Sequence, residues 1–150
     1  MRLFHGTDNA DIARPTVLTL GVFDGLHLGH QAIIRTVVDR ARAVAAAATV
    51  LTFEPHPRAV LHPQSAPPLL QTFDQKIEAL SVLGIDQTIV IHFDRAFAQI
   101  RAQAFLREIV AERLHAKEVY LGRVDRFKKI SDRYLVGLCD FAGDIQLQQK

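Results

Sequence analysis

Residues 15–30 read PTVLTLGVFDGLHLGH, and this stretch decides the fold. The run TVLTL at residues 16–20 is aliphatic and β-branched without polar alternation, which is typical of a strand buried on both faces of a parallel sheet. Glycines at positions 21, 25 and 29 follow, and they predict a loop that leads into a helix. A buried strand, a glycine-rich loop and a helix in this order are the usual opening of an open α/β sheet.

The same alternation of strand and helix continues downstream. Apolar residues recur at steps of three and four over residues 33–48, which predicts an amphipathic helix, and TVLTF at residues 49–53 predicts a second strand. A further helix is expected between Thr72 and Gly84, because Thr72 and Gln75 have the spacing of a capping box. The remaining expected elements are strands at 88–91 and 118–121 and a helix at 104–114. The pattern predicts an α/β domain with a Rossmann-like open parallel sheet of about four or five strands.

Two segments show no regular pattern. Residues 54–71 contain five of the six prolines, so they predict a long loop, and loops of this length inside a domain usually have a function. Residues 123–133 are basic with weak periodicity. They lack interleaved aromatic residues on which bases stack, so no nucleic-acid partner is expected.

The composition excludes several classes of protein and of site. A hydrophobic content of 49% with 23% charged residues describes a soluble globular chain and argues against disorder. No apolar run approaches the roughly 20 residues that a membrane span requires, and the N-terminus lacks the features of a signal peptide. The single cysteine, Cys139, excludes an internal disulfide and a multi-cysteine zinc site. Together these features predict a cytoplasmic protein without a membrane partner.

The loop after the first strand has the character of a phosphate site. It lies at the carboxyl edge of the predicted sheet, and the following helix offers unpaired N–H groups and a positive dipole end to an anion. His27 and His30 are three residues apart, so they share a face of the first helical turn and can donate hydrogen bonds to phosphate oxygens.

The histidines also allow two other interpretations. In the first, the loop is an ordinary turn and the histidines are surface residues. In the second, zinc binds His27, His30, His56 and His62. Helical zinc pairs are usually four residues apart and no cysteine joins these histidines, so no metal ligand is assigned.

Two motifs resemble a known family. The sequence TLGVFDGLHLGH at residues 19–30, followed by LTFEPHPR at residues 51–58, is similar to the N-terminal adenylyltransferase domain of bacterial FAD synthetases, the bifunctional riboflavin kinase/FMN adenylyltransferases. The resemblance covers residues 15–122. It implies the sheet of the HxGH nucleotidyltransferases and a reaction in which AMP passes from ATP to FMN. The products are FAD and pyrophosphate, and the reaction uses Mg²⁺.

The resemblance also implies roles for particular residues. His27 and His30 would be the catalytic residues that hold the ATP phosphates and stabilise the transition state. Phe53 and the loop at residues 55–58 would flank the flavin, although Phe53 at the end of a strand is equally typical of a core residue, and Arg58 of a solvated loop charge. The nucleotide- and flavin-binding residues implied by the family are Gly21, Phe23, Asp24, Gly25, Gly29, Phe53, Pro57 and Arg58.

The chain departs from the family after the fourth predicted strand. The family reads Gly-x-Asp-Phe-x-Phe-Gly there, whereas residues 122–128 read GRVDRFK. One register aligns Arg126 and Phe127 with the family's Arg-Phe pair; another treats residues 123–139 as an insertion and aligns Asp140 and Phe141. The family's later Ser/Thr-rich segment and its riboflavin kinase domain have no counterpart in this sequence.

We therefore expect residues 1–150 to form one FMN adenylyltransferase-like domain with a degenerate or truncated C-terminal part. ATP and FMN are the expected small-molecule partners. Adenylyl transfer is expected to be impaired, because the missing motifs help to position the two substrates. The alternatives are a non-catalytic nucleotide- or flavin-binding remnant and a nucleotidyltransferase for another phosphorylated substrate.

Overall fold

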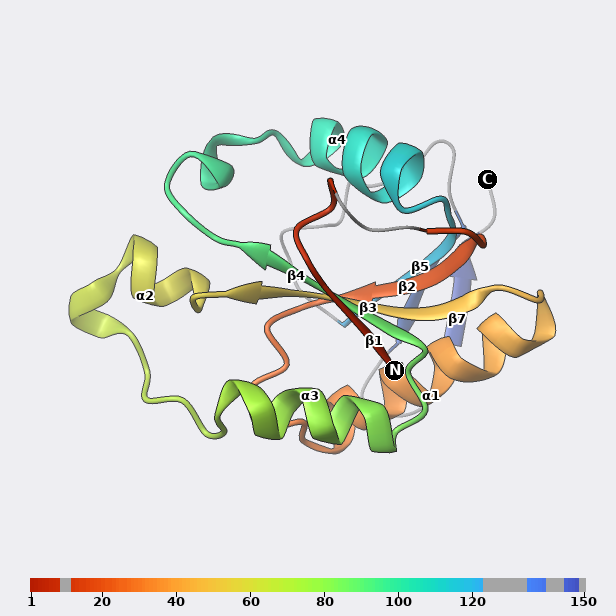
Figure 1. Ribbon diagram of the computed structural model, residues 1–150, viewed down its shortest axis with the longest axis horizontal. Helices are drawn as coiled ribbons and strands as arrows, with labels where there is room; N and C mark the ends of the chain where they lie inside the picture. Colours follow the sequence, from red (N-terminus) through yellow and green to blue (C-terminus); the bar gives the residue numbers. More distant parts are fainter. Residues whose placement is uncertain (9–11, 123–134, 140–144, 149–150) are drawn as a thin grey trace.

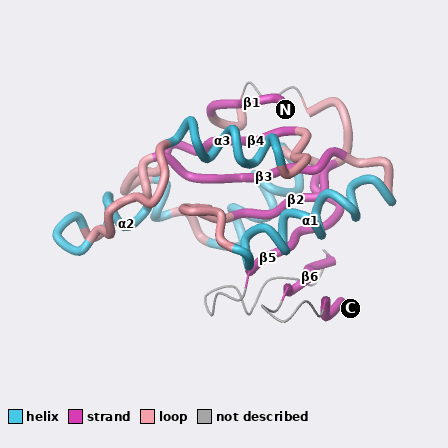
Figure 2. Tube along the Cα trace, turned by 90° about the horizontal axis from the view of Figure 1, so that it is seen from below, coloured by secondary structure: helices cyan, strands magenta, loops and turns pink. Residues whose placement is uncertain are grey.

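The computed structural model describes residues 1–8, 12–122, 135–139 and 145–148. These form a sheet in the order β1-β4-β3-β2-β5-β6-β7, in which every neighbouring pair is parallel except β6 and β7 (Figures 1 and 2). The strands are β1 (Arg2–His5), β2 (Thr16–Leu20), β3 (Ala47–Glu54), β4 (Gln87–His92), β5 (Ala116–Gly122), β6 (Leu135–Cys139) and β7 (Ile145–Gln148).

Helices cover both faces of the sheet (Figure 1). On one face, α1 (Leu28–Ala43) and α3 (Phe73–Val82) pack on a core that includes Val17 and Val50. On the other face, α4 (Ala102–Ala104) continues into the π-helix η3 (Phe105–Arg113), which packs on a core that includes Leu18. The remaining helical segments are α2 (Pro57–Leu61), η1 (Pro63–Ser65) and η2 (Phe97–Gln99).

The structure confirms the predicted α/β architecture. β2 and β3 are adjacent and parallel, with Thr16 opposite Ala47 and Leu20 opposite Leu51. The predicted capping box is also present, because the Thr72 hydroxyl accepts from Gln75 N at 3.2 Å and Thr72 N donates to Gln75 Oε1 at 2.9 Å.

Three expectations about element boundaries were wrong. The first helix ends at Ala43 rather than near residue 48, because Ala45 takes a positive φ of 52° and residues 46–48 are buried as β3 begins. Alanine has the highest helix propensity, so the alanine run favoured a longer helix, and burial in the sheet overrode that preference. The sheet has seven strands rather than the expected four or five, because β1, β6 and β7 were not predicted. Residues 54–71 are not one loop, since they contain α2 and η1.

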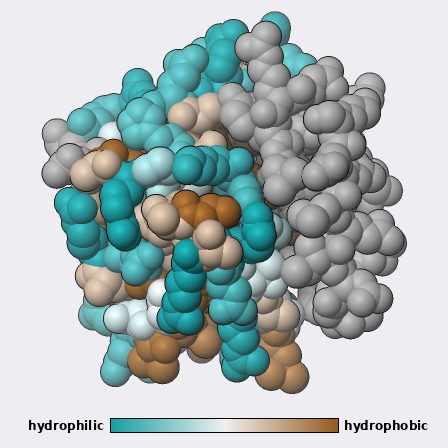
Figure 3. Space-filling model, turned by 90° about the vertical axis from the view of Figure 1, so that its right-hand side faces the viewer, coloured by the Kyte–Doolittle hydropathy of each residue, from teal (hydrophilic) through white to brown (hydrophobic). Residues whose placement is uncertain are grey.

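The basic stretch at residues 123–133 and both alternative registers for the altered motif fall mainly outside the described residues. Within the described ranges, no helix combines the length and the apolar character needed to cross a membrane. On the side seen in Figure 3, hydrophilic side chains cover most of the described surface and apolar atoms are visible only in separate patches.

Candidate functional site: the loop after β2 and its histidine pair

The loop at residues 21–27 leaves the carboxyl end of β2 and lies beside the end of β3. Gly21 N donates to the Leu51 carbonyl at 3.0 Å, which continues the pairing of the two strands into the loop. Phe23 and Leu26 both take positive φ, 52° and 36°, and both are buried. Positive φ is costly for such side chains, and their burial against α1 offsets that cost. The backbone of the loop is therefore set by packing and not by its glycines alone.

Gly25 is required by its surroundings. Its φ is +75°, and a Cβ at this position would lie 2.8 Å from Leu70 Cδ1. Any other residue would be strained and would displace Leu70. The sequence motif thus includes a glycine whose role is to let residues 70–76 approach the loop.

Residues 70–76, which we call the covering segment, hold the loop by three side-chain contacts. The Asp24 carboxylate accepts from Leu70 N at 3.0 and 3.1 Å, and Gln71 Nε2 donates to the Phe23 carbonyl at 2.7 Å. Lys76 Nζ donates to the Val22 carbonyl at 3.4 Å. Asp24 therefore shapes the loop through the covering segment. No sequence pattern predicts these contacts, because the partners are about 50 residues apart.

His27 and His30 lie together at the N-terminus of α1. His27 is the N-cap of the helix, and its Nδ1 accepts from His30 N at 3.4 Å. The two imidazole rings are stacked with centroids 3.7 Å apart, and the edge of Phe23 packs on His30 at 5.2 Å. The first turn of α1 contains no acidic residue. This helix end therefore combines a positive dipole with two imidazoles, an arrangement suited to an anion.

Burial keeps His30 neutral. Desolvation, reinforced by the adjacent His27, lowers the pKa of His30 from 6.5 to about 4, although the Asp24 carboxylate acts in the opposite direction. His30 thus offers hydrogen bonds rather than a charge at neutral pH. Within the described residues, His30 Nδ1 and Thr19 Oγ1 are the buried side-chain polar atoms that have no hydrogen-bond partner. Such atoms are rare in native proteins, and both belong to this site or to the strand that leads into it.

The predicted flavin-binding residues lie elsewhere on the carboxyl edge. The Phe53 ring packs against Phe93 and Phe97, with centroids 5.8 and 6.0 Å away, in the core on the η3 face. Phe23, beside the histidines, belongs to the core on the α1 face. The two aromatic residues therefore lie on opposite faces of the sheet.

Pro57 and Arg58 begin the short helix α2. His56 is the N-cap of this helix, and its Nδ1 accepts from Arg58 N at 3.0 Å. The Arg58 side chain is exposed at the start of α2, which extends beyond the end of β3 (Figure 1). Gly29 lies in the first turn of α1, between Leu28 and His30.

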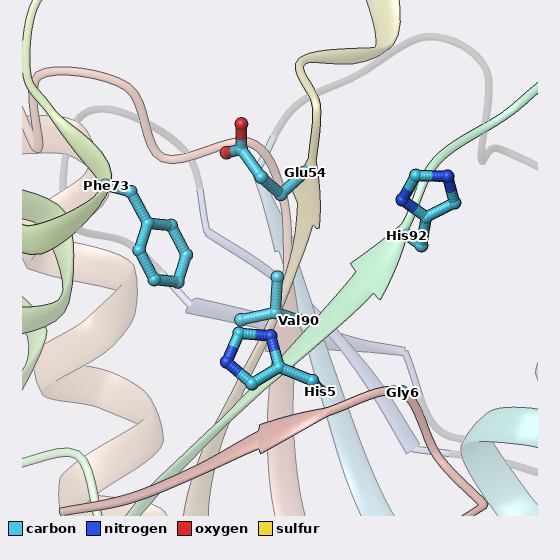
Figure 4. A pocket seen from close by; sticks show the side chains of 6 residues that line it. All are labelled: His5, Gly6, Glu54, Phe73, Val90 and His92. Carbon is cyan, nitrogen blue, oxygen red and sulfur yellow. The ribbon is translucent and has the colours of Figure 1, made fainter.

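An open pocket of about 440 Å³ lies at the carboxyl ends of β1, β3 and β4, beside the start of α3 (Figure 4). It is lined by His5, Gly6, Glu54, Phe73, Val90 and His92. Sequence reasoning missed this pocket because it did not predict β1, and because its lining residues belong to segments far apart in the chain. Among the described residues, no group of three His, Cys, Asp or Glu side chains is arranged to hold a metal ion.

Comparisons with known proteins identify the family of this chain. The sequence model of FAD synthetase matches residues 9–133. The bifunctional riboflavin kinase/FMN adenylyltransferases of Haemophilus influenzae and Escherichia coli K12 are 37% and 33% identical over 134 and 129 residues. These alignments cover 89% and 85% of this chain but 43% and 41% of the relatives, so the chain spans less than half of their length.

A solved structure shares the fold. The crystal structure described as a macrolide-efflux protein from Streptococcus pneumoniae superposes with a TM-score of 0.68 at 26% identity, over 81% of this chain and 42% of that one. The extent of the sequence match, over most of the chain and through both motifs, is the stronger finding. The chain belongs to the FAD synthetase family.

Proposed function

We propose that this chain is a nucleotidyltransferase domain of the FMN adenylyltransferase type, which transfers AMP from ATP to FMN and forms FAD and pyrophosphate. The observation that carries the proposal is the histidine pair at the N-terminus of α1, held at the end of β2 by a loop of positive-φ residues. Membership of the FAD synthetase family and the names of the relatives support the choice of substrates.

The proposed mechanism depends on positioning and hydrogen bonding. An oxygen of the FMN phosphate forms a bond to the α-phosphorus of ATP, while the bond from that phosphorus to the bridging oxygen breaks and pyrophosphate leaves. The N-terminal N–H groups of α1 bind the triphosphate, and the imidazoles of His27 and His30 donate to its oxygens as charge moves toward the leaving group. Gly21, Gly25 and Gly29 let the backbone approach the phosphates closely.

The flavin side of the site is proposed at the end of β3. Phe53 would contribute to an aromatic wall next to the isoalloxazine, with Pro57 beside it and Arg58 near the FMN phosphate. Arg58 is exposed at the start of α2, as a phosphate contact requires. Phe53 is partly buried among phenylalanines, so its contribution to binding is proposed to come through the shape of that wall.

Mg²⁺ is proposed to enter as part of the MgATP substrate. The described residues include no ready-made cluster of ligands, and the Asp24 carboxylate already accepts from Leu70 N. Mg²⁺ is commonly bound through substrate phosphates and few protein ligands, so a dedicated site is not required. The protein residues then act only on the ATP phosphates and on FMN, which accepts the AMP group.

We also propose that the domain comprises residues 1–150, is cytoplasmic, binds no nucleic acid and turns over slowly. The segment after Gly122 departs from the Gly-x-Asp-Phe-x-Phe-Gly pattern that the resemblance implies at this position. A misplacement of about 1 Å costs roughly a hundredfold in rate. ATP affinity is therefore expected to be retained better than adenylyl transfer.

Calorimetry of ATP binding tests the site. Replacing His27 or His30 by alanine removes a hydrogen bond to a charged group, worth about 1.5–3 kcal/mol, so ATP should bind at least about tenfold more weakly. His62→Ala is the matched control, because His62 is an exposed histidine at the end of α2. Unchanged affinity in both folded site variants would show that the triphosphate binds elsewhere.

A paired assay tests the reaction. The protein is incubated with FMN, Mg²⁺ and ATP radiolabelled at its α-phosphate, and labelled FAD is measured beside the equilibrium affinity for ATP. Slow FAD formation with retained ATP binding is the expected result. FAD formation at the rate of an intact synthetase would contradict the impairment, and ATP binding without any FAD would favour a nucleotide-binding remnant.

A further inference from the structure

Lys76 is a buried lysine on the side of α3 that faces the glycine-rich loop. Its side chain is 8% exposed; Nζ donates to the Val22 carbonyl at 3.4 Å and lies 4.0 Å from Glu54 Oε2. Lysine is almost never buried to this extent unless it is paired. Lys76 therefore joins α3 to the loop after β2 and to the end of β3 with a charge that water barely reaches.

The Val22 carbonyl, which Lys76 contacts, sets the orientation of the peptide between Val22 and Phe23. The Val22 carbonyl also accepts from Thr52 Oγ1 at 3.1 Å, so it is fixed from both α3 and β3. Because a peptide is planar and trans, fixing this carbonyl turns the N–H of the next residue, Phe23, in the opposite direction. Phe23 itself has a φ of 52°, which is stable only while the flanking groups keep it there.

We infer that Lys76 is a positioning residue for nucleotide binding: its ammonium group holds the Val22 carbonyl so that the loop at residues 21–27 presents its backbone to the triphosphate. The inference rests on the proposed function for the identity of the ligand. Lys76 does not touch the nucleotide, and it acts through the peptide between Val22 and Phe23. Its positive charge also offsets part of the negative charge of Glu54 and Asp24 beside the loop.

The charges around Lys76 predict how ATP affinity should depend on pH. Burial lowers the pKa of Lys76 below its ordinary value of 10.5, whereas the carboxylates of Glu54, on β3, and Asp24, in the loop, raise it. The Phe73 ring, 5.9 Å from Nζ, is the aromatic neighbour on the same helix. ATP affinity should thus fall at alkaline pH as Lys76 loses its proton, and replacing Glu54 by glutamine should move that fall to lower pH.

The test measures the binding of ATP and of inorganic tripolyphosphate by calorimetry. Lys76→Met keeps the approximate length of the side chain but removes its charge. This variant is expected to bind both ligands about tenfold more weakly. Lys76→Arg should restore affinity to within about threefold. Leu80→Ala is the control, because Leu80 is fully buried on the same helix and its loss lowers the unfolding temperature but leaves the contact between Lys76 Nζ and the Val22 carbonyl in place.

The outcomes separate this inference from the proposed function. If the wild type binds ATP and His30→Ala weakens it, but Lys76→Met binds ATP normally at all pH values, the inference is overturned and the proposed function stands. If the wild type does not bind ATP, both are overturned. If Lys76→Met does not fold, Lys76→Arg and Glu54→Gln decide, since an alkaline loss of affinity that neither variant shifts contradicts a role for Lys76.

Discussion

At the scale of single residues, His30 shows how burial determines the protonation state of a side chain. Its ring lies between His27 and Phe23, and its pKa is lowered to about 4 mainly because water is excluded from it. A neutral imidazole avoids the cost of an unpaired buried charge. A bound triphosphate would change this balance, because a nearby anion favours the protonated ring.

The stability of the protein is therefore expected to depend on His30 under mildly acidic conditions. The unfolded state takes up a proton near pH 6.5 and the folded state near pH 4, so stability falls as the pH decreases through this window. After allowance for solvent screening, the loss is about 1–2 kcal/mol. Urea unfolding near both ends of the window should show a smaller loss for His30→Gln than for the wild type. An equal loss in both proteins would place the acid sensitivity elsewhere.

At the scale of elements, a partly buried ion pair fixes α1 on the sheet. Arg40, near the end of α1, donates to both Glu118 carboxylate oxygens at 3.0 and 2.5 Å, and the buried Tyr120 hydroxyl donates to the same carboxylate at 2.8 Å. Hydrogen bonding from Arg40 lowers the pKa of Glu118, and burial raises the pKa of Tyr120 to about 12. The helix that carries the histidines is thereby held to β5 at its opposite end.

Glu118→Gln is expected to lower the free energy of unfolding by about 2 kcal/mol, because it removes a charged acceptor of three hydrogen bonds. The wild-type advantage should be complete above the ordinary pKa of 4.5 and should be lost as the pH falls through the lowered pKa of Glu118. Denaturant unfolding of both proteins over this range is the measurement. A constant difference down to the lowest pH would mean that packing, and not charge, accounts for the effect.

At the scale of the whole molecule, the order of the sheet separates the two ends of the carboxyl edge. The histidine site lies beside β2 near the centre, whereas β1 forms one edge and lines the pocket with His5. β1 has only four residues and pairs with β4 alone. The edge strand is therefore a peripheral part of the core.

A variant that begins at Gly6, and so lacks β1, is expected to be less stable but to keep the proposed nucleotide site. The loss should be about 1–3 kcal/mol, as is usual when a few buried contacts and hydrogen bonds are removed. ATP affinity should stay within about twofold, since β1 pairs with β4 at the edge of the sheet whereas the loop at residues 21–27 follows β2. Unfolding and calorimetry on the same preparation check both parts, and a large loss of affinity in the folded variant would show that the two regions are coupled.

The sequence predicted the features that depend on neighbours along the chain. The parallel pairing of β2 and β3, the capping box at Thr72 and the meeting of His27 and His30 all follow from local spacing and burial patterns. The ends of elements were less predictable where burial in the sheet overrides helix propensity, as in the alanine run before β3. The edge strand β1 is too short for its pattern to have been recognised.

Short motifs with a fixed spacing were enough to predict the α/β fold class, the position of the glycine-rich loop and the family. Only the tertiary structure decided that Lys76 and Gln71 hold the loop, that burial neutralises His30, and that Phe53 packs on the face opposite the histidines. The physical reason is distance along the chain. Contacts between residues about 50 positions apart, and the exclusion of water around them, exist only once the sheet and its covering helices have assembled.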